Sequence, residues 1–249
     1  RVVTAVKVDA IALDLRPRSM FEACDLGVRI VSANLRSVWA SCLPVYVLVL
    51  CACAAVLPWS LNWSIFALFW LKPWFDRSIL FVLARAIFGQ PTRFADLWAA
   101  RRAVFVQGWL GALTMRRLSP WRSFVQPVKQ LEGQRGKTGR QRIALILGAH
   151  RGAAFGMLSA FQSVELAVTI GLWTLPAWLV PADDRGSWLA ALFTSDHPWM
   201  SILYAASYAL AVLLVEPFFV GAGFAMYLNR RVELEAWDIE QEFRLAFAS

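Results

Sequence analysis

The stretch SVWASCLPVYVLVLCACAAVLP, residues 37–58, contains no charged side chain. An α-helix rises about 1.5 Å per residue, so this run can cross a hydrocarbon core of about 30 Å. The whole chain is 59% hydrophobic and 17% charged, with 13 Trp and 17 Phe among its 249 residues. A water-soluble fold of this size cannot bury so many apolar side chains. The sequence therefore predicts an all-α, polytopic membrane protein, with residues 37–58 as its clearest span.

A second apolar run follows at residues 59–89, and Lys72-Pro73 and Asp76-Arg77 interrupt it. Proline removes an intrahelical hydrogen bond and kinks or breaks a helix. We therefore expect a second span that is broken or bent at Lys72-Pro73. Together the two spans form a first transmembrane hairpin, residues 37–89.

The segment before the first span, residues 1–36, is predicted to contain an amphipathic helix at 19–36. Its apolar residues recur at spacings of three and four: Phe21, Cys24, Val28, Val31 and Leu35. Polar residues fill the opposite face, which is typical of a helix lying on a membrane surface. Packing against another element of the protein is the alternative. Residues 1–20 contain no continuous apolar run, so we expect no cleavable signal peptide.

Residues 90–142 form a strongly basic segment, in which eleven Lys and Arg residues stand against Asp96 and Glu132. This excess is the positive-inside signal and predicts a cytoplasmic or interfacial location. Within the segment, residues 103–115 are apolar but have arginine pairs at both ends. Thirteen residues are few for a span, so we expect an interfacial or re-entrant helix, with a further span as the alternative.

Residues 143–229 are apolar again and predict a second hairpin, with an acidic outer loop at 181–198 and a span broken at Glu216-Pro217. Arg230-Arg231 then returns the chain to the cytoplasm. The acidic tail, residues 230–249, is predicted to be helical; it could face the basic segment, although a solvated helix is the simpler interpretation. The expected architecture is about four transmembrane helices in two hairpins plus interfacial helices, with both termini cytoplasmic.

The start of the second hairpin carries small residues at every fourth position: Ala144, Gly148, Gly152, Gly156 and Ala160. Such a stripe allows another helix to approach closely. We therefore predict helix packing at the three glycines, Gly148, Gly152 and Gly156.

Five ionisable residues fall within the expected spans: Lys72, Asp76, Arg77, Glu165 and Glu216. A charge in the bilayer centre costs at least about 2.5–3.5 kcal/mol, so each side chain should face a partner or water. The cluster is either a set of structural ion pairs or a substrate or proton site.

An internal repeat suggests which of these side chains pair. Lys72-Pro73-Trp74-Phe75 and Glu216-Pro217-Phe218-Phe219 share the pattern charge, proline, aromatic, Phe. Proline-interrupted segments at corresponding positions of two halves mark binding sites in transporters, and chance similarity is the alternative explanation. If the repeat holds, Lys72 and Glu216 lie at equivalent depths and point at each other.

The sequence contains no recognisable catalytic, cofactor-binding or metal-binding motif. Gly136-Lys137-Thr138 resembles the end of a phosphate-binding loop, but Leu131 stands where that motif requires glycine. His150 and His197 are far apart, and the four cysteines are best explained by packing. The basic charge lies between membrane segments, so we expect lipid rather than nucleic acid as its partner.

Several stretches resemble a family of uncharacterised bacterial inner-membrane proteins. The matching residues are Leu15-Arg16-Pro17-Arg18, Glu22-Ala23-Cys24-Asp25-Leu26-Gly27, Leu71-Lys72-Pro73-Trp74-Phe75-Asp76-Arg77, Gln130-Leu131-Glu132-Gly133, Glu216-Pro217-Phe218, Leu228-Asn229-Arg230-Arg231 and Leu234-Glu235-Ala236-Trp237-Asp238-Ile239-Glu240. The overall arrangement of spans and segments is also weakly similar to the membrane domain of some glycerophosphoryl diester phosphodiesterases. The resemblance implies genes near MoxR-type ATPases, von Willebrand-type proteins and transglutaminase-like membrane proteins, and it implies no activity.

Two functions fit these observations best. The first is a non-catalytic inner-membrane subunit that anchors or assembles a bacterial envelope complex. For the chain in general, we expect contact with other membrane proteins or self-association. The second is a small transporter or channel made of two pseudo-symmetric hairpins. A lipid-acting enzyme is disfavoured, because no nucleophile and base are recognisable. Four spans are few for a transport path, which favours the first function.

Overall fold

The computed structural model describes residues 17–56, 61–107, 119–194 and 198–235, and every regular element in these ranges is a helix. The helices are α1 (Met20–Ala33), α2 (Leu35–Ala54), α3 (Leu61–Ala86), α4 (Phe94–Ala99), the short π-helical η2 (Arg102–Val106), α6 (Arg122–Gln130), α7 (Gly136–Leu147), α8 (Arg151–Leu179), α9 (Ala182–Thr194) and α10 (Pro198–Glu235). The predicted all-α class is confirmed for these residues.

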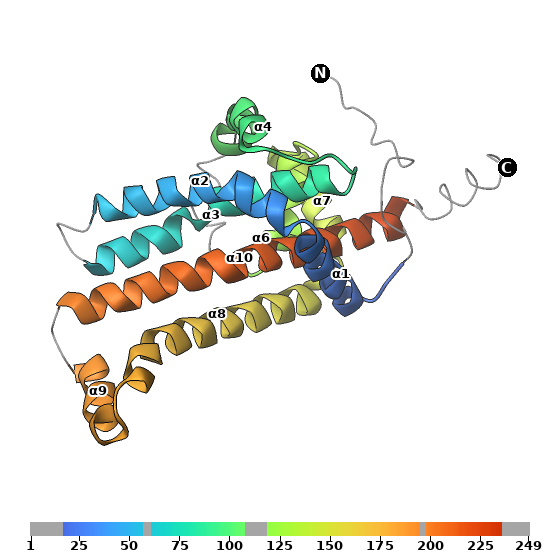
Figure 1. The fold of residues 1–249 in the computed structure, drawn as a ribbon. Coiled ribbons are helices and arrows are strands. Elements are labelled where there is room, and N and C mark those ends of the chain that lie inside the picture. Colours follow the sequence, from blue (N-terminus) through green and yellow to red (C-terminus); the bar gives the residue numbers. More distant parts are fainter. Residues whose placement is uncertain (1–16, 57–60, 108–118, 195–197, 236–249) are drawn as a thin grey trace.

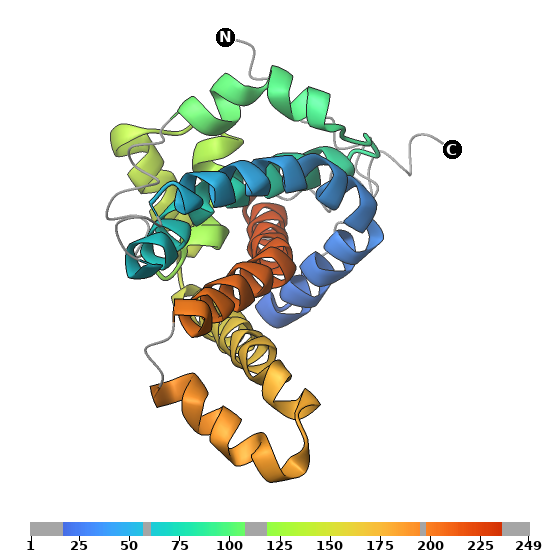
Figure 2. The ribbon, with the colours of Figure 1, turned by 60° about the vertical axis from the view of Figure 1, so that its left-hand side comes forward.

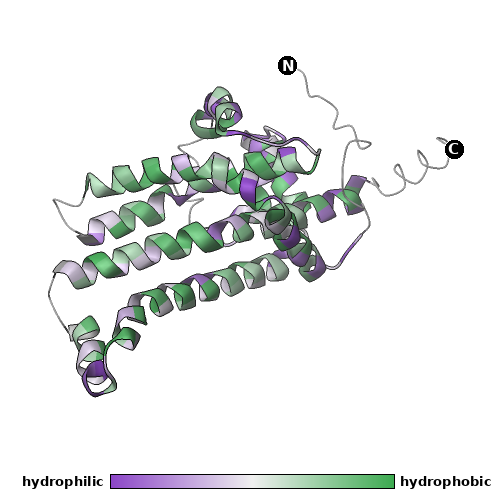
Figure 3. Cartoon of the chain, in the orientation of Figure 1, coloured by the Kyte–Doolittle hydropathy of each residue, from purple (hydrophilic) through white to green (hydrophobic). Residues whose placement is uncertain are grey.

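Three helices are long and apolar enough to cross a membrane: α2, α8 and residues 199–235 of α10. They run alongside one another and alongside α3 (Figure 1). α3 has 26 residues, but it carries Lys72, Asp76 and Arg77 and is not one of the three. Figure 3 shows hydrophobic residues along the halves of the long helices remote from α1. These three helices are compatible with a multi-pass membrane protein.

α10 is the central helix of the fold. Figure 2 shows α1, α3 and α8 arranged around it. In the most apolar 18-residue stretch of α10, 72% is buried inside the protein. The corresponding stretch of α8 is only 22% buried. The hydrophobic core therefore follows α10, and α8 presents most of its surface outward.

The outward surface of α8 is apolar. Phe155, Val164, Leu166 and Ile170 are all exposed on it. On α2, Leu43, Val47 and Leu48 are exposed as well. Water-soluble monomers rarely expose contiguous apolar surface of this kind, whereas lipid solvates it without penalty.

Glycines allow two helices to approach α10 closely. A Cβ atom added to Gly27 of α1 would lie 2.4 Å from the carbonyl oxygen of Gly221, and one added to Gly221 would lie 2.4 Å from Val31 Cγ2. A Cβ on Gly223 would lie 2.3 Å from Ser123 Oγ of α6. The crossings of α1 and α6 over α10 therefore depend on glycine at these positions.

The predicted packing at Gly152 and Gly156 is wrong within the described chain. A Cβ at either position would meet no atom within 4 Å, so no other described helix packs against the face of α8 that carries these two glycines. Gly148 instead lies between α7 and α8 with φ +39°, a conformation that favours glycine. Within the described chain the four-residue spacing therefore does not mark a close backbone approach at Gly152 or Gly156.

The two prolines do not break their helices as expected. α3 continues through Pro73, and α10 continues through Pro217 for all 38 of its residues. A proline removes one backbone donor, while the neighbouring turns keep their hydrogen bonds and side-chain packing holds the helix together. Both prolines therefore lie inside continuous helices, next to the charged residues Lys72 and Glu216.

α1 packs on α10 through a face that differs from the one its periodicity indicated. Ala23, Gly27, Ile30 and Val31 are buried in the contact, whereas Phe21 is 68% exposed. The small residues face α10 because the close crossing excludes larger side chains there. The alternative of packing on the protein is thus realised, and Phe21 remains accessible to the surroundings.

One expected segment differs in the structure, and two others lie partly outside the described residues. The acidic stretch expected to be a loop contains helix α9, which packs Leu192 and Trp188 near the start of α10. The tail continues α10 as far as Glu235. Residues 236–249 and most of 103–115 lie outside the described residues, as does His197.

Candidate functional site

Four helices bring charged side chains together beside the central helix. Lys72 Nζ of α3 lies 2.7 Å from Glu165 Oε2 of α8 and 2.6 Å from Glu216 Oε2 of α10. Arg122 Nη2 of α6 lies 2.8 Å from Glu216 Oε1. We call Lys72, Asp76, Arg122, Glu165 and Glu216 the buried cluster.

The local sequence explains how these side chains reach one point. Lys72 and Asp76 are four residues apart, so they project from the same face of α3. Glu165 and Glu216 each interrupt an apolar helix, and both are buried, with exposures of 5% and 1%. Because an unpaired buried charge is costly, the apolar surroundings leave ion pairing as the stable arrangement.

Asp76 completes the cluster in a different way. It is 2% exposed, and its Oδ1 has no hydrogen-bond partner among the described residues. Its carboxyl group interacts electrostatically with Glu216, Arg122 and Lys72. Asp76 is therefore a second buried carboxyl group beside Glu216, with an oxygen that can still accept a hydrogen bond.

Of the five residues predicted to cluster, four meet and one does not. The predicted contact between Lys72 and Glu216 is present, and Glu165 and Asp76 belong to the same group. Arg77 points away from them and donates from Nη2 to the carbonyl oxygen of Gln107. Adjacent residues of a helix project about 100° apart, so Arg77 cannot share the direction of Asp76.

A cavity of about 510 Å³ adjoins the cluster between α3, α6 and α7. Asp76 and Arg122 line it and so connect it to the cluster. Arg77 and Arg135 also line it, and Arg135 Nη2 donates to Gln107 Oε1 at 3.1 Å. Two guanidinium groups therefore meet at the backbone and side chain of one glutamine.

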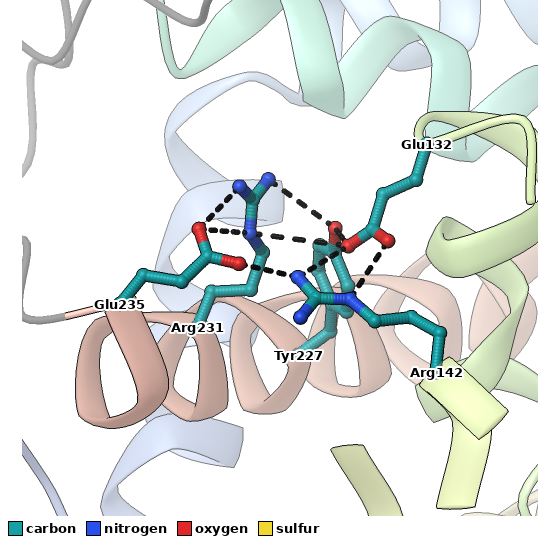
Figure 4. Close-up of polar contacts among 5 residues, drawn as sticks. All are labelled: Glu132, Arg142, Tyr227, Arg231 and Glu235. Carbon is teal, nitrogen blue, oxygen red and sulfur yellow. Dashed lines mark hydrogen bonds and ion pairs between the residues drawn. The ribbon is translucent and has the colours of Figure 1, made fainter. Parts of the chain in front are cut away.

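A second polar network lies at the C-terminal end of α10 and joins it to the basic segment (Figure 4). Arg142 of α7 donates to both carboxylate oxygens of Glu132, at 2.9 and 3.1 Å, and the Tyr227 hydroxyl donates to Glu132 at 2.6 Å. Arg142 also pairs with Glu235, which Arg231 Nη2 contacts at 2.5 Å. We call Glu132, Arg142, Tyr227, Arg231 and Glu235 the terminal network.

The terminal network has a clear electrostatic consequence. Its hydrogen bond to Glu132, followed by that to Glu235, raises the pKa of Arg142 above its ordinary value despite partial burial. Arg142 therefore stays charged. The first residues of the acidic tail thus face the basic segment. This is the first of the two alternatives for the tail, rather than the solvated helix.

Sequence reasoning missed Arg122 and the terminal network. Arg122 was counted as one of eleven topology-setting cations, and its partner Glu216 is 94 residues away. One usable signal was present, because Glu132 is one of only two acids in the basic segment. An isolated acid among cations favours ion pairing, although the sequence does not identify the partner.

The site contains no recognisable metal centre. Among the residues that the structure describes, no group of three or more His, Cys, Asp or Glu side chains is placed to hold a metal ion. Comparison with protein-family models, with curated proteins and with solved structures finds no match for the chain.

Proposed function

We propose that this protein is a non-catalytic, multi-pass subunit that anchors or assembles a protein complex in a bacterial inner membrane. In this proposal α2, α3, α8 and α10 all span the bilayer as two hairpins. Both termini lie in the cytoplasm with the basic segment, residues 90–142. The excess of cations in that segment supports this orientation.

The observation that carries the proposal is the internal pairing of the buried cluster. Lys72 contacts two carboxylates from two other helices, and Arg122 contacts one of them. These ion pairs hold α3, α6, α8 and α10 to one another. The charged groups are therefore largely engaged with each other inside the bundle. Such a bundle suits a rigid membrane anchor that offers its apolar faces and its polar end to partners.

Purification of the tagged chain after in-cell cross-linking tests the assembly proposal. We expect a defined partner in a fixed ratio and a complex that survives in a mild detergent. The same bait without cross-linker, and an unrelated tagged membrane protein, serve as controls. A chain that elutes alone or as a homo-oligomer under both conditions would contradict the proposal.

Cysteine labelling tests the topology separately. On a background without the four native cysteines, Asp184→Cys should react with a membrane-impermeant reagent from outside, and Arg135→Cys should not. Permeabilised cells provide the matched control, since both positions are exposed in the structure and should then react. Strong labelling of position 135 in intact cells would rule out the four-span orientation.

A proton-linked transporter is the second candidate, because the buried carboxyl group of Asp76 lines the cavity beside Glu216 and its Oδ1 has no hydrogen-bond partner among the described residues. Purified protein in liposomes loaded with a pH-sensitive dye provides the test. Transport would give a proton flux that Asp76→Asn abolishes. Absence of flux in liposomes, together with a stable partner in cells, would favour the anchoring function.

A further inference from the structure

The cavity between α3, α6 and α7 is strongly cationic. Its charged lining consists of five cations and one carboxylate: Arg77, Arg122, Lys129, Arg135, Arg140 and Asp76. Arg122 is already paired with Glu216, so we attribute the excess positive charge to Arg77, Arg135 and Arg140. A concave surface lined by side chains of one charge sign focuses the electrostatic potential and attracts a ligand of opposite charge.

Arg77 is the most informative residue of this wall. It is 7% exposed, and among the described residues its guanidinium is in contact with the neutral carbonyl of Gln107 but forms no ion pair with a carboxylate. A buried cation normally has a charged partner. Each of the other buried charges of α3, Lys72 and Asp76, meets at least one charged group. Arg77 alone among these three faces a neutral group, and it does so at the cavity wall.

Arg135 and Arg140 extend this arrangement from α7 and the turn before it. Arg135 shares Gln107 with Arg77. Arg140 is exposed at the cavity, and no ion pair with another described residue involves it. Planar guanidinium groups converging from two sides match the oxygen geometry of phosphate, which they bind through paired hydrogen bonds.

The rest of the cavity indicates what the phosphate is attached to. A volume of about 510 Å³ is far larger than one phosphate needs, and it falls within the range of small-molecule sites. Trp121, Val125, Ile143 and Leu147 add apolar lining. A ligand that fits has an anionic phosphate next to an organic portion.

We propose that this cavity is a binding site for a phosphate ester, held by Arg77, Arg135 and Arg140. The organic portion lies against the apolar lining. The ester is either the headgroup of an anionic phospholipid or a free phosphate ester of similar size. The site goes beyond the anchoring function and does not depend on it, since binding is measured on the isolated protein.

Two arms of one binding experiment distinguish the sources. In the first, the full chain in neutral detergent is titrated with glycerol 3-phosphate by calorimetry. In the second, nanodiscs of phosphatidylcholine with or without phosphatidylglycerol are compared by native mass spectrometry for lipid that stays bound. Binding in either arm supports the site and assigns its source, and binding in neither arm overturns it.

Variants show whether binding occurs in this cavity. Arg135→Gln with Arg140→Gln should weaken binding at least about tenfold, because two charge-assisted contacts are lost. Arg102→Gln with Lys137→Gln is the matched control, since it removes the same charge from exposed positions of the basic segment outside the cavity. It should change affinity less than about twofold.

Arg77→Gln tests the buried member, and a thermal melt shows whether that variant folds. Because Arg135 and Arg140 are exposed, the double variant keeps the proposal testable if Arg77→Gln does not fold. Equal loss of binding in the double variant and the matched control would indicate diffuse attraction and would overturn the proposal.

Discussion

The buried cluster and the terminal network have similar chemistry but different surroundings. In the cluster, the side chains of Lys72 and Glu216 are 2% and 1% exposed. In the network, those of Arg142 and Glu235 are 23% and 25% exposed. Water screens partly exposed pairs, whereas buried pairs lose their hydration and depend on each other. We therefore expect the cluster to determine whether the bundle assembles, and the network to position the end of α10 against α7.

The largest effect is expected at Glu216. Glu216→Gln leaves Lys72 with one carboxylate partner and removes the carboxylate that Arg122 contacts, so the free energy of unfolding should fall by about 3–5 kcal/mol. Denaturant titration in detergent measures it. Asp184→Asn, an acid-to-amide change on the exposed face of α9, is the control and should cost less than about 0.5 kcal/mol.

A double variant tests whether the cluster acts as a unit. Lys72→Met should also destabilise the protein, and Lys72→Met with Glu216→Gln should recover part of the summed loss. Recovery is expected to be partial because Glu165 then loses its Lys72 contact. Fully additive losses would show that the two residues act independently, which would remove the contrast with the terminal network.

The next largest effect separates packing from charge. Gly27→Ala places a Cβ 2.4 Å from the carbonyl oxygen of Gly221, and backbone cannot move aside as a side chain can. We expect a loss of about 1–3 kcal/mol from overpacking, measured by the same titration. Gly152→Ala is the matched control and should be neutral or slightly stabilising, because nothing lies within 4 Å. Equal effects at both positions would refute the crossing of α1 over α10.

A smaller loss is expected in the terminal network. Glu132→Gln weakens two hydrogen bonds from Arg142 and one from Tyr227. We expect the free energy of unfolding to fall by about 1–2 kcal/mol. This is less than for Glu216→Gln, because Arg142 is partly exposed. Added salt should reduce the stability loss caused by Glu132→Gln and leave the loss caused by Glu216→Gln unchanged. A loss as large as that of Glu216→Gln would show that the two regions do not differ as proposed.

The smallest effect concerns Arg231 and Glu235, an i, i+4 pair at 2.5 Å on α10. A double-mutant cycle with Arg231→Gln and Glu235→Gln should give a coupling energy of about 0.3–0.5 kcal/mol. Measuring the cycle at low and high salt should show it decline. Coupling above about 2 kcal/mol would place this pair with buried ion pairs rather than surface ones.

Much of the architecture was predictable from residue patterns. The apolar runs at residues 37–58 and within 143–229 predicted helices able to cross a membrane, since lipid-exposed backbone must satisfy its own hydrogen bonds. The meeting of Lys72 with Glu216 was also predicted, because buried opposite charges are most stable together. The expected helix breaks at the prolines are absent, since one missing hydrogen bond does not end a well-packed helix, and the acidic segment contains helix α9, which buries Leu192. The outside location of that segment stays a prediction.

The sequence by itself determined that this chain needs an apolar solvent and that its buried charges need partners, because both follow from the transfer free energies of side chains. Apart from the predicted pairing of Lys72 with Glu216, only the tertiary structure decided which partners they have. Arg122 meets Glu216 across 94 residues, and Tyr227 meets Glu132 across 95. The glycines at the α1 and α6 crossings and the cationic cavity are likewise products of helix placement. Periodicity along one helix identifies an apolar face, but the angle and depth at which another helix crosses it depend on packing between distant segments.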